Sequence, residues 1–462
     1  MFKRKIEKEL NEYYNDTNNQ NILIIYGARQ IGKSFIIRET AKSHFKHYAE
    51  IDLKDDYEGE KRFLNVKTAK DFYLLVGSLF DDLNNYSDTI IFLDEIQFYP
   101  HLLSMLKPLK KENKYRYIVS GSLLGLTLQH SFIPMGSISE KQMFPMDFEE
   151  FLWANKYGKE SIEYLKDCFN NIMPINESVH EYTLRLFKDY LLCGGLPDAV
   201  IEYVENRNVS EMRRVHDEIF RYYKDDCSKY DNYHKLKIRR VYDLLSSYMV
   251  NKVKRVQFKQ LEGKDDSNLE KYQDEFDYLF DSGITLPSRA ISNPIFPLDE
   301  SKSKNLIKVY YNDVGLLTNI LYKKNIDAVL QKDKGINLGS VYETASAMEL
   351  IAHGHKLYYF DSKKVGEVDF LINDYENLSI TPVEIKSGND QNNFRAIPKL
   401  VDPDGKYVMS KGYIFGNNNV LKKENNLIIL PIYLIMFLWF WYLIHTFHNN
   451  SRSFYFCTTV QI

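Results

Sequence analysis

A glycine-rich stretch near the N-terminus constrains the fold of this chain more than any other feature of its sequence. Residues 27–34 read GARQIGKS, follow the apolar run Ile22–Tyr26 and precede a helical pattern that opens at Phe35. The glycines at 27 and 32 permit positive φ angles, so successive backbone N–H groups can turn inward around an anion at a helix N-terminus. The pattern predicts a strand, a phosphate-binding loop and a helix.

Each position of this loop has an expected contact with a nucleotide. Lys33 would reach the β- and γ-phosphates as a point charge, and the hydroxyl of Ser34 would ligate Mg²⁺. We therefore predict ATP and Mg²⁺ as cofactors. The predicted nucleotide-binding residues are Gly27, Ala28, Arg29, Gln30, Ile31, Gly32, Lys33 and Ser34.

Two carboxylates follow a second apolar run, Thr89–Leu93. Asp94 is the candidate residue for holding Mg²⁺ together with Ser34, and Glu95 is the candidate general base that polarises the attacking water. With Lys33, Glu95 forms the predicted catalytic pair. An exposed acidic helix cap is the alternative interpretation of both acids.

A third apolar run, Tyr115–Val119, leads into two serines that flank a glycine. The hydroxyls of Ser120 and Ser122 are candidate sensors of the γ-phosphate, although a plain turn explains them nearly as well. Apolar runs and amphipathic stretches alternate through the first 150 residues, which predicts a parallel sheet covered by helices. The expected strands are Ile22–Tyr26, Tyr48–Leu53, Thr89–Leu93 and Tyr115–Val119, and the expected helices include Thr68–Leu83 and His101–Lys111.

The middle of the chain, from Asp147 to about Arg255, has mostly helical periodicity. The pattern that follows resembles a winged helix, with its second helix at Asn268–Phe280. That helix carries four acids and one lysine, so phosphates would repel it, and we expect the fold to serve protein packing. Residues 229–264 hold ten Lys or Arg against three acids, which is either a DNA-backbone surface or a solvated face.

A third region combines a helical stretch, Gly339–Leu350, with two adjacent predicted strands that carry acids and a lysine. Because strand side chains repeat every two residues, Glu384 and Lys386 share a face and Asp369 can stand opposite them. Asp369 and Glu384 could bind a divalent cation, Lys386 could position water and Glu343 could complete the acidic set. The order resembles the PD-(D/E)xK nuclease core; a salt-bridged, solvated hairpin is the alternative.

Several motifs outside the phosphate-binding loop point to a family. The order GARQIGKS, FLDEIQFYPHLLSMLK, VSGS, MFPMDFEEFL and CGGLPDAV resembles, over about residues 1 to 435, bacterial and archaeal AAA-type ATPases with a C-terminal domain of unknown function. The resemblance implies ATP hydrolysis. Such proteins often carry a Gly-Arg pair where this chain has Pro134-Met135-Gly136-Ser137, and this departure leaves the identity of an arginine finger open.

Composition limits the partners and the compartment. Sixty Lys and Arg against 63 Asp and Glu give a net charge of −3, which excludes the strong positive field of a general nucleic-acid coat protein. Four cysteines without a CxxC pair, and an N-terminus without an apolar signal region, favour a reducing cytoplasm. The uncharged run Leu427–Ile444 reaches the lower limit for a membrane span, but Pro431 favours a buried strand over Leu427–Leu430 followed by a short apolar helix.

We therefore expect an α/β chain in four segments. They are a P-loop AAA-type ATPase domain (1–155), a helical and winged-helix-like region (156–300), a mixed α/β nuclease-like domain (301–437) and an apolar tail (438–462). The expected function is an ATPase that acts as a switch for the C-terminal effector or docking domain. The alternatives are an ATP-gated, metal-dependent nuclease or DNA-processing protein, and an interaction module that binds ATP without turnover. DNA, a second copy of the chain and another protein are the candidate partners.

Overall fold

The computed structural model describes residues 2–16, 21–81, 83, 88–122, 136–226, 235–250, 256, 269–301, 303–323, 325–330, 336–388, 394–407, 409 and 411–439. Two compact units make up the chain, and their segments alternate along the sequence. Unit 1 comprises Met1–Tyr157, Lys188–Leu286 and Val309–Asp333, and unit 2 comprises Gly158–Phe187, Pro287–Lys308 and Lys334–Ile462. The four consecutive segments expected from the sequence stay a prediction.

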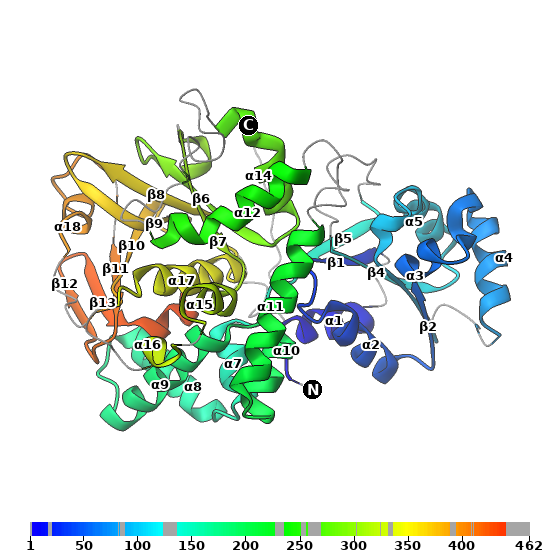
Figure 1. Ribbon diagram of the computed structural model, residues 1–462, viewed down its shortest axis with the longest axis horizontal. Coiled ribbons are helices and arrows are strands. Elements are labelled where there is room, and N and C mark those ends of the chain that lie inside the picture. Colours follow the sequence, from blue (N-terminus) through cyan, green and yellow to red (C-terminus); the bar gives the residue numbers. More distant parts are fainter. Residues whose placement is uncertain are drawn as a thin grey trace, which may run out of the picture. The chain divides into compact units, whose positions relative to one another are not determined.

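The core of unit 1 is a five-stranded parallel sheet with the order β2-β3-β4-β1-β5, in blue and cyan in Figure 1. The strands are β1 (Ile22–Tyr26), β2 (His47–Asp52), β3 (Thr89–Asp94), β4 (Arg116–Gly121) and β5 (Ile138–Gln142). The four predicted strands coincide with β1 to β4, each end within two residues. Strand β5 was not predicted, because its sequence ISEKQ is polar and lies at the edge of the sheet.

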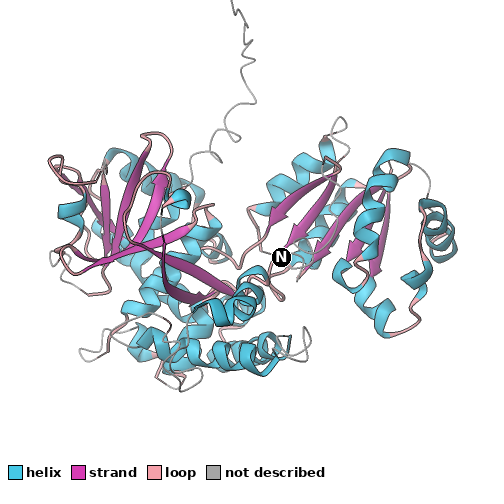
Figure 2. Cartoon of the chain, turned by 90° about the horizontal axis from the view of Figure 1, so that it is seen from above, coloured by secondary structure: helices cyan, strands magenta, loops and turns pink. Residues whose placement is uncertain are grey.

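Helices flank this sheet (Figure 2). They are α1 (Ile6–Asn15), α2 (Lys33–His44), α3 (Leu53–Glu58), α4 (Ala69–Leu79) and α5 (His101–Glu112). Apolar side chains of α4 and α5 pack with β1 to β4 in one buried cluster. In parallel strands the carboxyl ends meet at one edge, so the residues that follow β1, β3 and β4 are brought together there.

The rest of unit 1 is mainly helical, as predicted. Its helices include α7 (Phe148–Ala154), α10 (Pro197–Val200), α11 (Val209–Asp226), α12 (Lys235–Val250), α14 (Gln273–Asp281), α15 (Val314–Tyr322) and α16 (Asp327–Leu330). The winged-helix prediction is incomplete here because residues 258–261 lie outside the described residues. In the basic stretch, the ammonium of Lys237 lies 3.9 Å from a carboxylate oxygen of Glu275, and the guanidinium of Arg239 lies 3.2 Å from one of Asp225. Six other basic residues of this stretch lie outside the described residues, at positions 229, 252, 254, 255, 259 and 264.

An eight-stranded mixed sheet, with the order β12-β13-β11-β10-β9-β8-β6-β7, confirms the third predicted region. Its strands are β6 (Thr285–Ile291), β7 (Ser303–Tyr311), β8 (Leu357–Ser362), β9 (Gly366–Asp374), β10 (Ser379–Ile385), β11 (Gly412–Gly416), β12 (Lys422–Glu424) and β13 (Leu427–Pro431). Helices α8 (Lys159–Asn171), α17 (Gly339–Ala352) and α18 (Ile397–Leu400) belong to unit 2, and α9 (Glu177–Cys193) runs from unit 2 into unit 1.

The apolar run near the C-terminus is a buried strand followed by a short helix, as preferred from the sequence. Strand β13 is continued by a 3₁₀ helix, Ile432–Phe437, and both are largely buried. The ring of Trp439 stacks on His353 with centroids 4.1 Å apart. Among the described residues, no helix is long and apolar enough to cross a membrane, and residues 440–462 lie outside them.

Candidate nucleotide-binding site

The glycine-rich loop connects β1 to α2 with the backbone that its sequence predicts. Gly27 and Gly32 have φ angles of 146° and 90°. A Cβ at position 27 would overlap the carbonyl oxygen of Met143, so only glycine fits there. Gln30 also adopts a left-handed φ of 63°, which is uncommon for a residue with a side chain. The loop is therefore held in a specific, tightly packed conformation at the N-terminus of a helix.

Lys33 is buried inside this loop. Its side chain is only 5% exposed, and its Nζ donates to the carbonyl oxygens of Gly27, at 2.9 Å, and Ala28, at 2.7 Å. Burial lowers the pKa of Lys33 to about 8, although the nearby carboxylates of Glu95 and Asp94 act in the opposite direction. The ammonium thus lies where the sequence predicts a phosphate-binding cation.

Asp94 meets the loop at the carboxyl end of β3. Its carboxylate accepts a hydrogen bond from the hydroxyl of Ser120 and is almost fully buried. Burial raises the pKa of Asp94, while the hydroxyls of Ser120 and Ser34 lower it. The structure therefore places the predicted metal pair, Ser34 and Asp94, in the lining of the same cavity, and Ser120, one of the two sensor candidates, contacts Asp94.

Glu95 begins the turn that follows β3, with a left-handed φ of 55°. Its Oε2 accepts hydrogen bonds from Ser122, at 2.9 Å, and from Gln97. A strained backbone at a cleft residue is a recurrent feature of functional sites. Both predicted sensor serines thus touch the two acids at the carboxyl end of β3: Ser120 contacts Asp94, and Ser122 contacts Glu95.

Arg29 ties the loop to helix α11, a contact that sequence analysis missed. Its Nε donates to Ser122 Oγ at 3.1 Å, and its Nη1 lies 2.8 Å from Asp226 Oδ1. The hydroxyl of Tyr223, one turn earlier on α11, donates to the carbonyl oxygen of Arg29 at 2.9 Å. A continuous set of side-chain contacts therefore runs from Glu95 through Ser122 and Arg29 to α11.

The motif MFPMDFEEF has a structural role next to the loop. Asp147 caps the N-terminus of α7, and its side chain accepts from the backbone N–H of Glu150 at 2.9 Å. Glu150 in turn holds the guanidinium of Arg4, which donates to the carbonyl oxygens of Ile31, at 2.9 Å, and Phe144, at 2.8 Å. Arg4 was not singled out from the sequence, because nothing local marks it.

The motif CGGLPDAV brings two backbones into close contact. The N–H of Gly195 donates to Asp313 Oδ2 at 2.7 Å, and the carbonyl oxygen of Gly195 accepts from Met146 N–H at 2.7 Å. A Cβ on Gly195 would lie 2.7 Å from Met146 N, which explains the glycine. Pro197, at the start of α10, then reaches the loop, close to Gly32.

A cavity of about 570 Å³ opens at the loop, within the usual range for small-molecule sites. Basic and acidic side chains share its wall with apolar ones. Its lining includes Arg4, Arg29, Lys33, Ser34, Arg38, Asp52, Lys54, Asp94, Glu95, Met146, Pro197, Asp198 and Ile201. All of these residues belong to unit 1, so a single unit carries the nucleotide-binding residues predicted from the sequence.

The nuclease-like candidates come together in unit 2. The register of β9 and β10 pairs Val383 with Phe370, and one residue further along it places Asp369 opposite Glu384. Asp369 Oδ2 accepts from the N–H of Ile385 at 2.8 Å, and Glu384 Oε1 lies 2.7 Å from Lys386 Nζ.

The acid predicted on the helix also belongs to this group. The burial of Glu384 raises its pKa, and the nearby carboxylate of Glu343, on α17, raises it further. Lys386 and Lys308 oppose that rise. Lys308 and its partner Glu367 were not among the sequence candidates.

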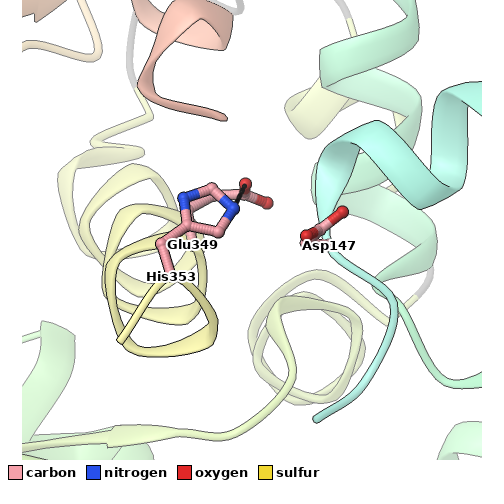
Figure 3. Close-up of side chains that lie close together, drawn as sticks. All are labelled: Asp147, Glu349 and His353. Atoms are coloured by element: carbon pink, nitrogen blue, oxygen red, sulfur yellow. Dashed lines mark ion pairs between the residues drawn. The ribbon is translucent and has the colours of Figure 1, made fainter. Parts of the chain in front are cut away.

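Helix α17 carries a second acid that belongs to a different contact. Glu349 Oε2 lies 3.7 Å from His353 Nε2, and both side chains are fully buried (Figure 3). Glu349 follows Glu343 by six positions, which is about 240° around a helix, so the two acids project in different directions. The pair at 349 and 353 is therefore separate from the carboxylates of β9 and β10.

Comparisons with known proteins divide the chain into three parts. Residues 19–152 match the family model described as an AAA domain. Residues 184–327 and 338–435 match two domains of unknown function, DUF8612 and DUF4143. An uncharacterized protein of Methanocaldococcus jannaschii is 24% identical over 445 residues, which is 93% of this chain and 87% of that protein.

Solved structures that resemble this chain are distant. A Walker-type ATPase of Pyrococcus abyssi is 15% identical with a TM-score of 0.43, covering 69% of this chain and 95% of its own. The Orc1 protein of Aeropyrum pernix, in complex with DNA, is 12% identical with a TM-score of 0.28, covering 71% of this chain and 93% of its own.

Proposed function

We propose that the protein binds ATP with Mg²⁺, hydrolyses it and uses the nucleotide state as a switch. The match of residues 19–152 to an AAA domain supports this proposal. The position of Ser34 and Asp94 in one cavity, beside the buried ammonium of Lys33, carries the proposal. Hydroxyl and carboxylate oxygens are the ligands that Mg²⁺ prefers, so these side chains fit the ion.

In the proposed reaction, water attacks the γ-phosphate and each residue has one task. Lys33 exchanges its two carbonyl partners for phosphate oxygens and neutralises their charge. Ser34 and Asp94 would hold Mg²⁺, which supplies charge stabilisation for the phosphates when bound. Glu95 orients the water and accepts its proton, and Ser122, bonded to Glu95, places that carboxylate.

The contacts of Arg29 support the switch. Arg29 lies within the phosphate-binding loop and pairs with Asp226 at the last position of α11. A nucleotide that rearranges the loop changes this pair and the bond from Ser122. The state of the site is thereby passed to the helical part of unit 1, and we assign unit 2 as the effector or docking part of the protein.

Two substitutions test the enzymatic part of the proposal. We expect Lys33→Ala to abolish binding of labelled ATP, whereas Lys42→Ala, an exposed lysine on the same helix, leaves it unchanged. We expect Glu95→Gln to keep ATP binding and to lower phosphate release by about 100-fold or more, the usual effect of losing a general base. Undiminished phosphate release by Glu95→Gln removes the base assignment, and full ATP binding by Lys33→Ala removes the site.

The convergence of Asp369, Glu384 and Lys386 favours one alternative, an ATP-gated and metal-dependent nuclease. It requires Mg²⁺-dependent nicking of DNA by the wild-type chain. Lys386→Ala would abolish this nicking, and Lys33→Ala would keep the metal-dependent nicking but remove its response to ATP. Phosphate release that depends on Lys33, without any nicking, supports the ATPase switch instead.

A further inference from the structure

Lys308 points its charged end into the carboxylates of unit 2. It lies on β7 within the otherwise uncharged sequence LIKVYY, and its side chain is 1% exposed. Its Nζ is 2.7 Å from Glu367 Oε1 and 4.0 Å from Glu343 Oε2. The same ammonium lies 4.8 Å above the ring centre of Tyr359, which is also buried.

Because Lys308 is buried, its charge must be compensated by groups of the protein. An ammonium withdrawn from water is retained only where negative groups compensate for its lost hydration. Glu343 is 5% exposed and supplies such a group from α17, while Glu367, 46% exposed, supplies another from β9. Lys308 therefore neutralises acids from two different elements of unit 2, which is what a bound cation does in a carboxylate site.

The second lysine of the cluster is also paired. Lys386 Nζ lies 2.7 Å from Glu384 Oε1, and the side chains are 23% and 12% exposed. Lys308 and Lys386 both oppose the rise in the pKa of Glu384 that its burial causes. Two ammonium groups thus already act on three of the acids, Glu343, Glu367 and Glu384, and Asp369 lies opposite Glu384 on the neighbouring strand.

A divalent cation would compete with Lys308 for the same oxygens. Mg²⁺ and Ca²⁺ need carboxylate oxygens at about 2.0 to 2.6 Å, and here an oxygen of Glu367 faces the ammonium instead. An ion held by Glu343 and Glu367 would lie a few ångströms from a buried like charge. Because both cations cannot be accommodated, one excludes the other.

We propose that Lys308 is a built-in cation that takes the place of a divalent metal ion among Glu343, Glu367, Asp369 and Glu384, so that the site is latent while this lysine is present. The inference concerns unit 2 alone and does not depend on ATP hydrolysis in unit 1. It also means that the wild-type cluster does not support metal-dependent cleavage. Removing the ammonium leaves four acids with one lysine, a set of oxygen ligands suited to Mn²⁺, Mg²⁺ or Ca²⁺.

The test is a Mn²⁺ titration of the nucleotide-free, full-length chain, with free Mn²⁺ measured by electron paramagnetic resonance. Lys308→Met keeps an apolar side chain of similar length, and Lys308→Gln is a second variant in case the first does not fold. We expect both to gain one site that binds Mn²⁺ at least tenfold more tightly than any site of the wild-type chain. The added ion should also raise the melting temperature of these variants but not of the wild type.

Two controls locate the new site. Adding Glu384→Ala to Lys308→Met should remove the gained binding. Lys356 also lies 2.7 Å from a carboxylate, that of Asp299, but its side chain is 74% exposed. Lys356→Met should therefore gain no Mn²⁺ site. The phosphate-binding loop is the same in all these chains, so any ion that it binds cancels in the comparison.

Two results overturn the inference. One is Mn²⁺ binding by the wild-type chain that Glu384→Ala abolishes, which shows that the lysine does not exclude metal. This comparison needs no variant at position 308, so it can overturn the inference even if both such variants are unfolded. The other is a folded Lys308→Met chain that gains no Mn²⁺ site, which shows that the cluster is not a metal site even without its lysine.

Discussion

The pH dependence of nucleotide binding follows from the burial of Lys33. In the free chain, burial lowers the pKa of this lysine from its ordinary value of 10.5 to about 8. A bound triphosphate stabilises the ammonium, so the pKa should be much higher in the complex. Nucleotide binding above pH 8 must then include the uptake of a proton by Lys33, and affinity must fall as the pH rises.

The size of the effect follows from the pKa. At pH 7.5 about three quarters of the free chains carry the ammonium, and at pH 9 about one in eleven does. If only the charged form binds well, the affinity for ATP falls by about eightfold between these values, or about 1.2 kcal/mol. At pH 8.5 binding should take up about 0.75 proton.

Calorimetric titration with a nonhydrolysable ATP analogue measures both quantities. Repeating it in buffers of different ionisation enthalpy gives the number of protons taken up. Lys33→Arg is the matched control: its guanidinium stays charged over this range, so its weaker binding should be independent of pH. The reasoning is refuted if the wild-type affinity is as flat as that of Lys33→Arg, since the free lysine would then be fully charged at pH 9.

Stability should respond to the same lysine with the opposite sign. The pKa of Lys33 is lower in the folded chain than the ordinary value of 10.5, so the unfolded chain binds more protons between about pH 8 and 10.5. The contribution of Lys33 to the free energy of unfolding therefore rises with pH in that window, while ATP affinity falls. Urea unfolding of the wild type and of Lys33→Met at pH 8 and pH 10 measures this contribution. Because Lys33→Met has no buried ammonium, it should be more stable than the wild type at pH 8, and the difference in the free energy of unfolding should be smaller at pH 10.

Two further comparisons test the packing around the site by urea unfolding. Gly195→Ala should destabilise the chain by about 3 kcal/mol, because the added Cβ would overlap the backbone of Met146. Gly77→Ala, where the added Cβ has no described heavy atom within 4 Å, should stabilise helix α4 by about 0.5 kcal/mol. Equal effects of the two substitutions would contradict the packing argument. Asp226→Asn should lower the free energy of unfolding by about 1 to 2 kcal/mol, because the ion pair of Asp226 with Arg29 is mostly buried. Asp225 is 61% exposed, so Asp225→Asn should lower it by less than about 0.5 kcal/mol. A larger loss for Asp225→Asn would show that the Arg29 pair does not hold α11.

The parts of the site that lie close together in sequence were predictable. The loop, its lysine and its serine occupy one strand-turn-helix unit, and local rules for glycine, apolar runs and helix starts determine it. The position of Asp94 also follows from local rules, because the carboxyl ends of parallel strands meet at one edge. As a result of both, Ser34 and Asp94 line the same cavity.

The contacts that join distant segments were not predictable in this way. Arg29 and Asp226 are 197 positions apart, and Gly195 and Asp313 are 118 apart. No periodicity within either segment indicates which partner it will meet. The glycines of CGGLPDAV could be recognised as a turn, but the backbone that packs against them could be identified only from the fold.

The carboxylates of unit 2 show how such a distant partner changes a functional interpretation. The alternation of strand side chains placed Asp369, Glu384 and Lys386 together correctly, but it could not include Lys308, which comes from a strand at the edge of the same sheet. A lone lysine in an apolar strand must either reach solvent or meet a buried acid, and at 1% exposure only the second is possible. A cluster of acids therefore indicates a metal site only after the lysines that reach it from other elements have been considered. In this cluster, Lys308 supplies the positive charge that a metal ion would otherwise supply.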